Sequence, residues 1–239
     1  MVEAAARLEN KIALITGGNR GIGRAIAQIF GDEGATVIIT GRDQGALDST
    51  SEAIGVRAVP VRCDLTNTAE VQRLFADIER RFGRIDLLVN NAGTAHALAN
   101  VDRLSIAEWK RVIDTNLTAT FLCTQLALPL MDSEAVIVNN LSISARQAFP
   151  GAAAYNASKS GALGFTNTLR IELREKGIRV IALLSGAVDT DIWQQFWPDA
   201  PRQKMVDPED VARAVLLAVT LPSNTSMDEI QIGPAIGTL

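Results

Sequence analysis

Short apolar runs alternate along the chain with longer segments in which apolar residues recur at helical spacing. The runs are rich in β-branched residues and almost continuously hydrophobic, which is typical of parallel strands covered on both faces. Six such strands are predicted, at residues 12–16, 36–40, 57–61, 87–90, 135–140 and 179–184. Strands that alternate with helices indicate βαβ units, so we predict an α/β fold with a doubly wound parallel sheet and helices on both faces.

Two of the intervening segments carry helix-start signals. Asn67 and Glu70 have the spacing of a capping box, and Asp207 followed by Pro208 combines an N-cap with proline at the first helical position. No Pro-, Gly- or Ser-rich linker, low-complexity run or internal repeat interrupts the chain. We therefore predict a single domain over residues 1–239.

The composition narrows the class of protein without identifying it. The 239 residues are 47% hydrophobic and 21% charged, which is typical of a soluble globular protein. A net charge of −4 does not favour nucleic-acid or membrane-surface binding. Residues 1–11 lack the apolar stretch of a signal peptide, and no window approaches a membrane span, so a cytoplasmic location is expected.

The cysteines and the single histidine give no sign of a metal site. Cys63 and Cys123 lie in apolar segments without a partnering Cys or His pattern, which predicts buried free thiols in a reducing compartment. No cluster of His, Cys, Asp and Glu has ligand spacing, so we expect no catalytic metal.

A glycine-rich loop joins the first predicted strand to the helix that follows it. Such glycines let the chain turn tightly and bring backbone N–H groups close to a pyrophosphate, while the helix N-terminus supplies partial positive charge. A turn without any ligand is the alternative, but this loop leaves a strand and opens a helix, which is the context that the motif requires. We predict that a dinucleotide contacts Gly17, Asn19, Arg20, Gly21, Ile22 and Gly23.

The end of the second predicted strand bears on which dinucleotide is bound. Enzymes that select NAD usually carry a carboxylate here for the ribose 2′-hydroxyl, whereas an arginine matches a 2′-phosphate. This chain has Gly41 and Arg42, and Arg20 offers a second cation. A solvated surface arginine is the alternative interpretation. We predict NADP(H) in preference to NAD(H).

Tyr155 and Lys159 lie one turn apart on the same face of a predicted helix. A free tyrosine, with a pKa of about 10, is a poor acid–base catalyst near neutral pH, but a nearby cation lowers that pKa by roughly 1–3 units. A phenol tuned in this way can exchange a proton with an alcohol or carbonyl oxygen. The spacing alone is a weak pattern, and its weight comes from the other motifs.

Together these motifs resemble the classical short-chain dehydrogenases/reductases over essentially the whole chain. The resemblance implies a Rossmann-type fold and a nicotinamide-dependent oxidoreductase. It rests on Thr16-Gly17-x-x-x-Gly21-x-Gly23 as the cofactor loop, Asp64-Leu65 at the adenine, Asn90-Asn91-Ala92-Gly93 as the fourth-strand motif, Asn116, Ser142 thirteen residues before Tyr155, and Tyr155-x-x-x-Lys159. Ser144 lies close to Ser142, but the spacing favours Ser142 as the catalytic serine.

The family's mechanism implies a role for each catalytic residue. Tyr155 would protonate the substrate oxygen during reduction or deprotonate the alcohol in reverse, and Ser142 would donate a hydrogen bond to the same oxygen. Lys159 would lower the Tyr155 pKa and hold the nicotinamide ribose. Asn116 would bind, through its helix backbone, a water that links Lys159 to solvent. Asn91 is expected to tie the fourth strand to the cofactor rather than to perform chemistry.

Two segments depart from the family pattern. After the sixth predicted strand, Ser185 replaces the usual proline, while Gly186, Val188 and Thr190 remain to contact the cofactor. The loss of proline removes a rigid turn residue. Residues 227–234 lack the Val-x-Gly-Gly ending of many tetrameric relatives. We therefore expect a homo-oligomer that is a dimer, through the helices bearing Asn116 and Tyr155, rather than a tetramer.

Residues 189–206 would form a substrate lid in this family. Trp193, Phe196 and Trp197 lie within five residues of one another, so they either face an apolar substrate or pack the lid onto the body or a partner subunit. His96 follows the fourth-strand motif in a loop expected near the substrate, and a catalytic role for it is unnecessary beside Tyr155 and Lys159. No charged residue stands out as an anchor for a phosphate or a coenzyme-A-type carrier.

These expectations favour an NADP(H)-dependent oxidoreductase, of the carbonyl reductase type, that interconverts a small or medium, largely apolar ketone and a secondary alcohol. A cofactor-binding regulatory or scaffold protein of the same fold is a second hypothesis, although such proteins usually lose the Tyr, Lys and Ser that are present here. A lyase or epimerase that uses Tyr155 for proton abstraction is a third, although those relatives generally have a longer C-terminal substrate region.

Overall fold

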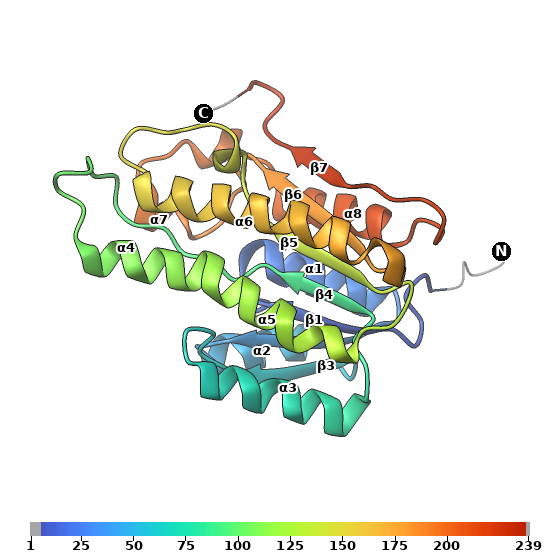
Figure 1. The fold of residues 1–239 in the computed structure, drawn as a ribbon. Helices are drawn as coiled ribbons and strands as arrows, with labels where there is room; N and C mark the ends of the chain where they lie inside the picture. Colours follow the sequence, from blue (N-terminus) through green and yellow to red (C-terminus); the bar gives the residue numbers. More distant parts are fainter. Residues whose placement is uncertain (1–5, 238–239) are drawn as a thin grey trace.

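The computed structural model describes residues 6–237, and within them seven parallel strands form one sheet in the order β3-β2-β1-β4-β5-β6-β7 (Figure 1). The strands are β1 (Ile12–Thr16), β2 (Thr36–Gly41), β3 (Ala58–Arg62), β4 (Leu87–Asn90), β5 (Val136–Asn140), β6 (Arg179–Ser185) and β7 (Glu229–Ile232). The predicted fold class is confirmed, and all six predicted strands lie within one residue of the observed bounds.

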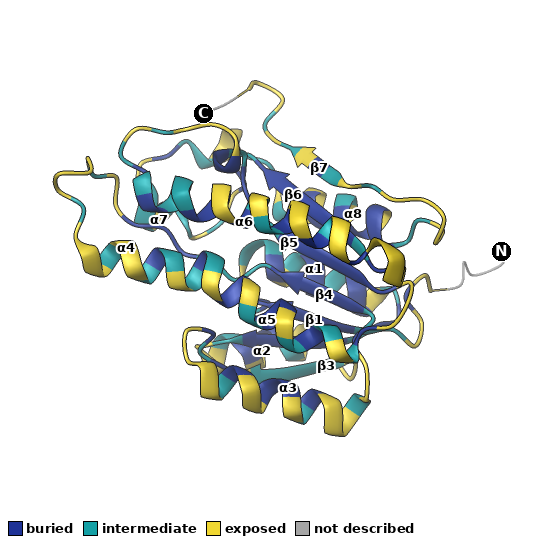
Figure 2. Cartoon of the chain, viewed as in Figure 1, coloured by how far each residue is buried: buried dark blue, intermediate teal, exposed yellow. Residues whose placement is uncertain are grey.

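Helices cover both faces of the sheet (Figure 1). The helices are α1 (Gly21–Asp32), α2 (Gln44–Ile54), α3 (Thr68–Phe82), α4 (Ile106–Ile113), α5 (Ala119–Ala127), α6 (Ala153–Glu172), α7 (Trp193–Phe196) and α8 (Pro208–Val219), with a π-helical turn, Asp114–Thr118, between α4 and α5. Apolar side chains of α1, α2 and α8 pack on one face, and those of α3, α5 and α6 pack on the other. The inner strands between them are almost entirely buried, as the continuous hydrophobicity of their sequences predicts, whereas the edge strands β3 and β7 are partly exposed (Figure 2).

The helix-start signals form as predicted, with one change of partner. The Asn67 side chain accepts hydrogen bonds from the backbone of Ala69 and Glu70, and Asp207 accepts one from the backbone of Glu209. The Glu70 carboxylate, however, accepts from the Asp64 backbone N–H at 2.8 Å instead of from the Asn67 backbone. It thereby fixes the loop that leaves β3, next to the predicted adenine contact.

The order of the strands makes two loops diverge next to β1, at one edge of the sheet. The chain moves outward from β1 through β2 to β3, and then returns to pair β4 with the other edge of β1. The loops after β1 and β4 therefore diverge at the carboxyl edge of the sheet, where ligands bind in open α/β folds.

Cys63 and Cys123 are buried free thiols, as predicted. None of the helices in residues 6–237 combines the length and the apolar character that a membrane crossing needs.

Candidate active site

A cleft of about 880 Å³ lies at the carboxyl edge of the sheet and is lined by loops that follow six of the strands. All but three of the predicted site residues line it. They are Gly17, Asn19, Arg20, Gly21, Ile22, Arg42, Asp64, Leu65, Asn91, Ala92, Gly93, Ser142, Tyr155, Lys159, Gly186, Val188, Thr190 and Trp193. Gly23, Asn116 and His96 lie outside the lining.

The glycine loop leaves no room for side chains. Gly17 and Gly21 adopt positive φ angles of 62° and 51°, which non-glycine residues rarely tolerate. A Cβ atom at Gly23 would lie 2.3 Å from both the Gly17 carbonyl oxygen and the Asn91 Nδ2. The three glycines therefore allow α1 to approach the ends of β1 and β4.

The N-terminus of α1 suits an anionic ligand. Its N-cap residue, Arg20, makes no side-chain capping hydrogen bond, and its first turn contains no acidic residue. The first backbone N–H groups of a helix have no partner within the helix, and they carry its partial positive charge. With the glycine loop in front of them, these groups fit the pyrophosphate of a dinucleotide.

Asn91 connects three strands at the floor of the cleft. Its Nδ2 donates to the carbonyl oxygens of Thr16 and Gly17 at 3.0 and 3.1 Å, and its Oδ1 accepts from Asn140 at 2.8 Å. The Thr16 hydroxyl oxygen accepts from the backbone N–H groups of Asn91 and Ala92. These bonds tie the end of β4 to the glycine loop and to β5, and the contact of Asn91 with the cofactor stays a prediction.

Positive charge gathers at one end of the cleft. Arg20, Arg24 and Arg42 all line this end, and all three are exposed. The first carboxylate after β2, Asp43, caps α2 by accepting from the Ala46 backbone at 3.1 Å. The end of β2 therefore presents Arg42, with Arg20 and Arg24 from the start of α1, while the Asp43 carboxylate is engaged in capping α2.

Asp64, which follows β3, lines the same end of the cleft. Burial alone would raise its pKa, but hydrogen bonds from Thr66 and the charges of Arg42 and Arg62 outweigh burial and lower the pKa. Asp64 is thus an ionised hydrogen-bond acceptor near neutral pH. Leu65 beside it supplies apolar surface, as expected of a residue that contacts a base.

Three of the predicted catalytic residues converge at the other end. Tyr155 and Lys159 come from α6, with the Lys159 Nζ 5.6 Å from the centre of the Tyr155 ring. The same Nζ donates to the Asn140 carbonyl at the end of β5, at 2.9 Å. The Ser142 Oγ accepts from the Ser144 backbone N–H at 3.1 Å, so its own hydrogen is left to donate.

Burial, rather than the lysine charge, dominates the ionisation of this pair. It raises the pKa of Tyr155 to about 12, against a smaller opposing effect of Ser142, and it lowers the pKa of Lys159 to about 8. The expected lowering of the Tyr155 pKa is therefore not seen in this arrangement, because both groups lose solvation and the ammonium is directed to the Asn140 carbonyl. A pKa raised in this way favours the protonated phenol at neutral pH.

The comparison with known proteins decides the family. Residues 11–201 match the family model described as short chain dehydrogenase, which covers most of the chain. The chain belongs to this family. It is 34% identical to an uncharacterised oxidoreductase of Staphylococcus aureus, over 95% of this chain and 98% of that protein. It is 37% identical to a 3β-hydroxysteroid dehydrogenase of Mediterraneibacter gnavus, over 81% of this chain and 71% of that protein.

Solved structures agree with this assignment. The closed form of a serine dehydrogenase complexed with NADP⁺ superimposes with a TM-score of 0.88 at 28% identity, covering 95% of this chain and 96% of that one. A 3-ketoacyl-(acyl-carrier-protein) reductase from Brucella melitensis complexed with NADH gives a TM-score of 0.86 at 31% identity, covering 94% and 97%. This short-chain dehydrogenase is therefore an oxidoreductase whose structural relatives bind nicotinamide cofactors.

Asn116 of this short-chain dehydrogenase lies in the π-helical turn between α4 and α5 and is buried. Its side-chain amide accepts from the Thr94 backbone N–H at 2.8 Å and donates to the Thr94 carbonyl and to the Ser158 hydroxyl, at 2.9 and 3.0 Å. Its backbone carbonyl accepts from the Thr120 hydroxyl at 3.0 Å. The side chain is thus committed to structure, and only the backbone is left for a water.

His96 does not belong to the cleft. It is 3% exposed, and its Nδ1 lies 2.8 Å from the Ala97 carbonyl, outside the residues that line the cavity. The apolar residues that line the cleft instead include Leu98, Phe149 and Phe196, and Phe196 packs against the Tyr155 ring. Sequence reasoning missed Leu98 and Phe149 because they lie in irregular loops, where no periodicity or motif marks a residue that faces a ligand.

The lid expected at 189–206 leaves and rejoins the body at one point. Val188 and Val206 form an isolated parallel bridge, and the Asp189 backbone donates to the Val206 carbonyl at 2.9 Å. The Trp193 indole donates to the Val188 carbonyl at 2.8 Å. Phe196 of α7 meets the Tyr155 ring edge to face, with centroids 5.1 Å apart.

Within residues 6–237, no group of three or more His, Cys, Asp and Glu could hold a metal ion.

Proposed function

We propose that this short-chain dehydrogenase interconverts a small or medium, largely apolar ketone and a secondary alcohol, with NADP(H) as the cofactor and Tyr155 as the acid or base. The convergence of Tyr155, Ser142 and Lys159 at one end of a cleft, with the glycine loop at the other, carries this proposal. When bound, the nicotinamide cofactor supplies or accepts the hydride.

At the end of the cleft that contains Tyr155, each polar group holds or moves a proton. The Tyr155 hydroxyl donates its proton to the substrate oxygen during reduction, and the Ser142 hydrogen, left free by the Ser144 contact, stabilises charge on that oxygen. Lys159 as an ammonium stabilises the phenolate that results. We propose that the Asn116 backbone carbonyl, at the π-helical turn, holds the water through which Lys159 regains a proton.

The cofactor preference rests on the charged end of the cleft. Arg42 and Arg20 offer cations to a 2′-phosphate, and the Asp43 carboxylate is engaged in capping α2. The relatives leave both choices open, since one carries NADP⁺ and another NADH. We propose NADP(H) because Arg42 stands where an NAD-selective enzyme carries an available carboxylate.

The substrate class follows from the wall around Tyr155. Leu98, Phe149, Trp193 and Phe196 line this part of the cleft, and Lys159 is the one Lys or Arg of the described lining outside the arginine-rich end. An anionic carrier would find no cationic anchor there. The 37% identity to a 3β-hydroxysteroid dehydrogenase also supports an apolar secondary alcohol.

The assembly and the location remain proposals as well. Phe121 on α5 is 46% exposed and meets Phe165 on α6 with ring centroids 5.8 Å apart, and Ile171 further along α6 is 72% exposed. This apolar surface supports a homodimer through α5 and α6, which sedimentation equilibrium would test. We propose a cytoplasmic location.

A panel of ketones and secondary alcohols, assayed with NADPH and NADH, tests the function. We expect ketone-dependent NADPH oxidation, with apolar substrates preferred. Tight NADPH binding without turnover of any substrate would favour a regulatory or scaffold protein instead. Substrate conversion without net cofactor oxidation would favour a lyase or epimerase.

A further inference from the structure

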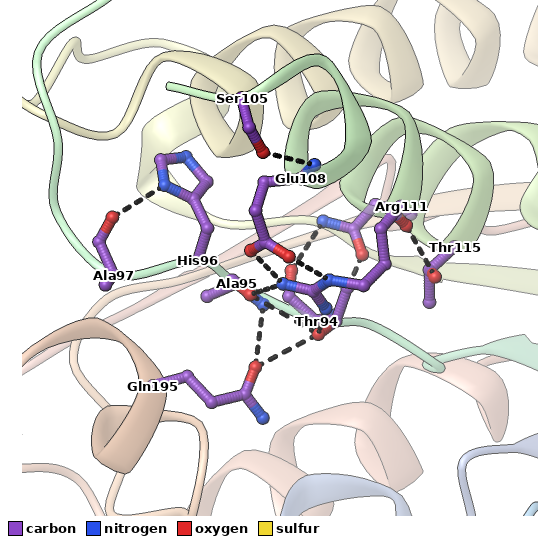
Figure 3. A network of polar contacts seen from close by, with 10 residues as sticks. Thr94, Ala95, His96, Ala97, Ser105, Glu108, Arg111, Thr115 and Gln195 are labelled. Carbon is purple, nitrogen blue, oxygen red and sulfur yellow. Dashed lines mark hydrogen bonds and ion pairs between the residues drawn. The ribbon is translucent and has the colours of Figure 1, made fainter. Parts of the chain in front are cut away.

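A network of polar contacts joins the lid to the segment that follows β4 (Figure 3). Arg111 on α4 donates to the Thr94 hydroxyl oxygen and to the Ala95 carbonyl, both at 2.6 Å. Glu108 holds the arginine through two hydrogen bonds, at 3.0 and 2.7 Å. Thr94 is the next residue after the fourth-strand motif, and Asn116 fixes its backbone on both sides.

Arg111 sets the direction of the Thr94 hydroxyl. A guanidinium group has donors only, so the Thr94 oxygen must accept from it, and the Thr94 hydrogen is left to donate. Two acceptors lie within reach, the Ala95 carbonyl at 3.4 Å and the Gln195 Oε1 at the shorter 3.0 Å. The Oε1 of Gln195 lies 3.0 Å from that hydroxyl and also 3.4 Å from the Ala95 backbone nitrogen. Because both neighbours are donors, the amide oxygen of Gln195, rather than its NH₂ group, faces them.

Gln195 lies on α7, directly before the residue that touches Tyr155. Among residues 6–237, the hydrogen bonds from lid residues 190–205 to the segment after β4 all end on its Oε1. The other polar contacts of the lid stay within it or return to its base near Val188. The far side of the lid is therefore tied to the body at Gln195.

We propose that Gln195 is a positioning residue that latches the lid onto Thr94, so that Phe196 is held against the Tyr155 ring and the apolar substrate wall is complete. Arg111 acts through Thr94, because it occupies the hydroxyl oxygen as a donor and leaves the hydroxyl hydrogen for the lid. The same Thr94 is bonded to Asn116, so the closed lid and the catalytic π-helical turn share one anchor residue. This inference rests on the proposed function for its effect on substrate, but the latch itself is independent of turnover.

Hydrogen exchange of the lid tests the latch without any substrate. Gln195→Met keeps the length of the side chain and removes its oxygen, and Gln194→Met makes the same change on the exposed neighbour, for which no side-chain hydrogen bond is found in residues 6–237. We expect Gln195→Met to speed amide exchange across 192–197 roughly five- to tenfold, which is the effect of losing about one hydrogen bond. Gln194→Met should exchange as the native protein does, and so should Gln195→Glu, which keeps acceptor oxygens for both donors.

Kinetics with a responsive ketone give the second readout. An open lid lowers the fraction of enzyme that is competent to bind, so the KM of Gln195→Met should rise, by at most the factor found for exchange, while kcat changes little. Thr94→Val should speed lid exchange as Gln195→Met does, because it removes the same bond from the other side, and Thr94→Ser should restore the native rate.

Two results separate failure of the latch from failure of the proposed function. Equal lid exchange in Gln195→Met and Gln194→Met, measured with and without NADPH, would overturn the latch whatever the activity. Faster exchange in Gln195→Met alone, with no ketone turned over even by the native protein, would support the latch and refute the ketone reductase.

Discussion

The close approach of α1 to the ends of β1 and β4 predicts a large effect of Gly23→Ala. The new Cβ would lie 2.3 Å from the Gly17 carbonyl oxygen and from the Asn91 Nδ2, distances that real Cβ atoms do not show. Overpacking of this kind costs roughly 1–3 kcal/mol. If the Asn91 amide is displaced, its two bonds to Thr16 and Gly17 are also lost, at roughly 1 kcal/mol each. We expect a total near 4 kcal/mol, which lowers Tm by roughly 8–16 °C in a chain of this size.

Urea unfolding and calorimetry would measure this loss of stability. Titration with NADPH would measure how far the substitution weakens cofactor binding at the glycine loop. Gly45→Ala is the matched control, since Gly45 is exposed in the first turn of α2 and its Cβ would meet only the Asp43 carboxylate, at an ordinary 3.5 Å. The control should be neutral or stabilising by up to roughly 1 kcal/mol. If Gly23→Ala lost no more stability than Gly45→Ala, the close approach of α1 to the ends of β1 and β4 would be refuted.

Three further predictions concern the two ends of the cleft. Arg42→Asp should shift the ratio of NADPH to NADH affinity toward NADH, and an unchanged ratio in a fluorescence titration would mean that Arg42 does not face the 2′-phosphate. Ser142→Ala should lower kcat for ketone reduction by roughly 10²–10³-fold, while Ser144→Ala, two residues away, should cost far less; equal losses would contradict the assignment of the serine. Burial lowers the Lys159 pKa to about 8, so ketone reduction should fall as pH rises through about 8, where Lys159 loses the charge that stabilises the phenolate product. Burial raises the Tyr155 pKa to about 12, so alcohol oxidation, which needs the phenolate, should rise only as pH approaches 12; a reduction rate that increases with pH would refute this pairing.

The sheet was largely predictable because buried parallel strands carry a local signal. Each of the six predicted strands is a near-continuous apolar run, and the burial of β1, β2, β4, β5 and β6 accounts for it. The strand β7 was missed, since only Ile230 of its four residues is buried and charged or polar residues alternate with it. An edge strand of this kind depends on pairing with β6, which no local pattern reveals.

The site residues were predictable to the extent that backbone geometry demands particular residue types. Gly17, Gly21 and Gly23 are readable from sequence because no side chain fits there. The ionisation of Tyr155 was not readable, because spacing gives the distance to Lys159 but not how far burial removes both groups from water. The tie between Gln195 and Thr94, about a hundred residues apart, exists only in the folded chain.

The acid–base role of Tyr155 is the central claim about the proposed reaction. The substitution Tyr155→Phe tests this role most directly. The substitution removes one hydroxyl and keeps the ring that packs against Phe196. The measurement is single-turnover NADPH oxidation with the best ketone of the panel, alongside NADPH affinity. We predict a loss of roughly 10²–10⁴-fold in the rate, with cofactor affinity nearly unchanged. Turnover close to that of the native enzyme would contradict the assignment of Tyr155 as the proton donor.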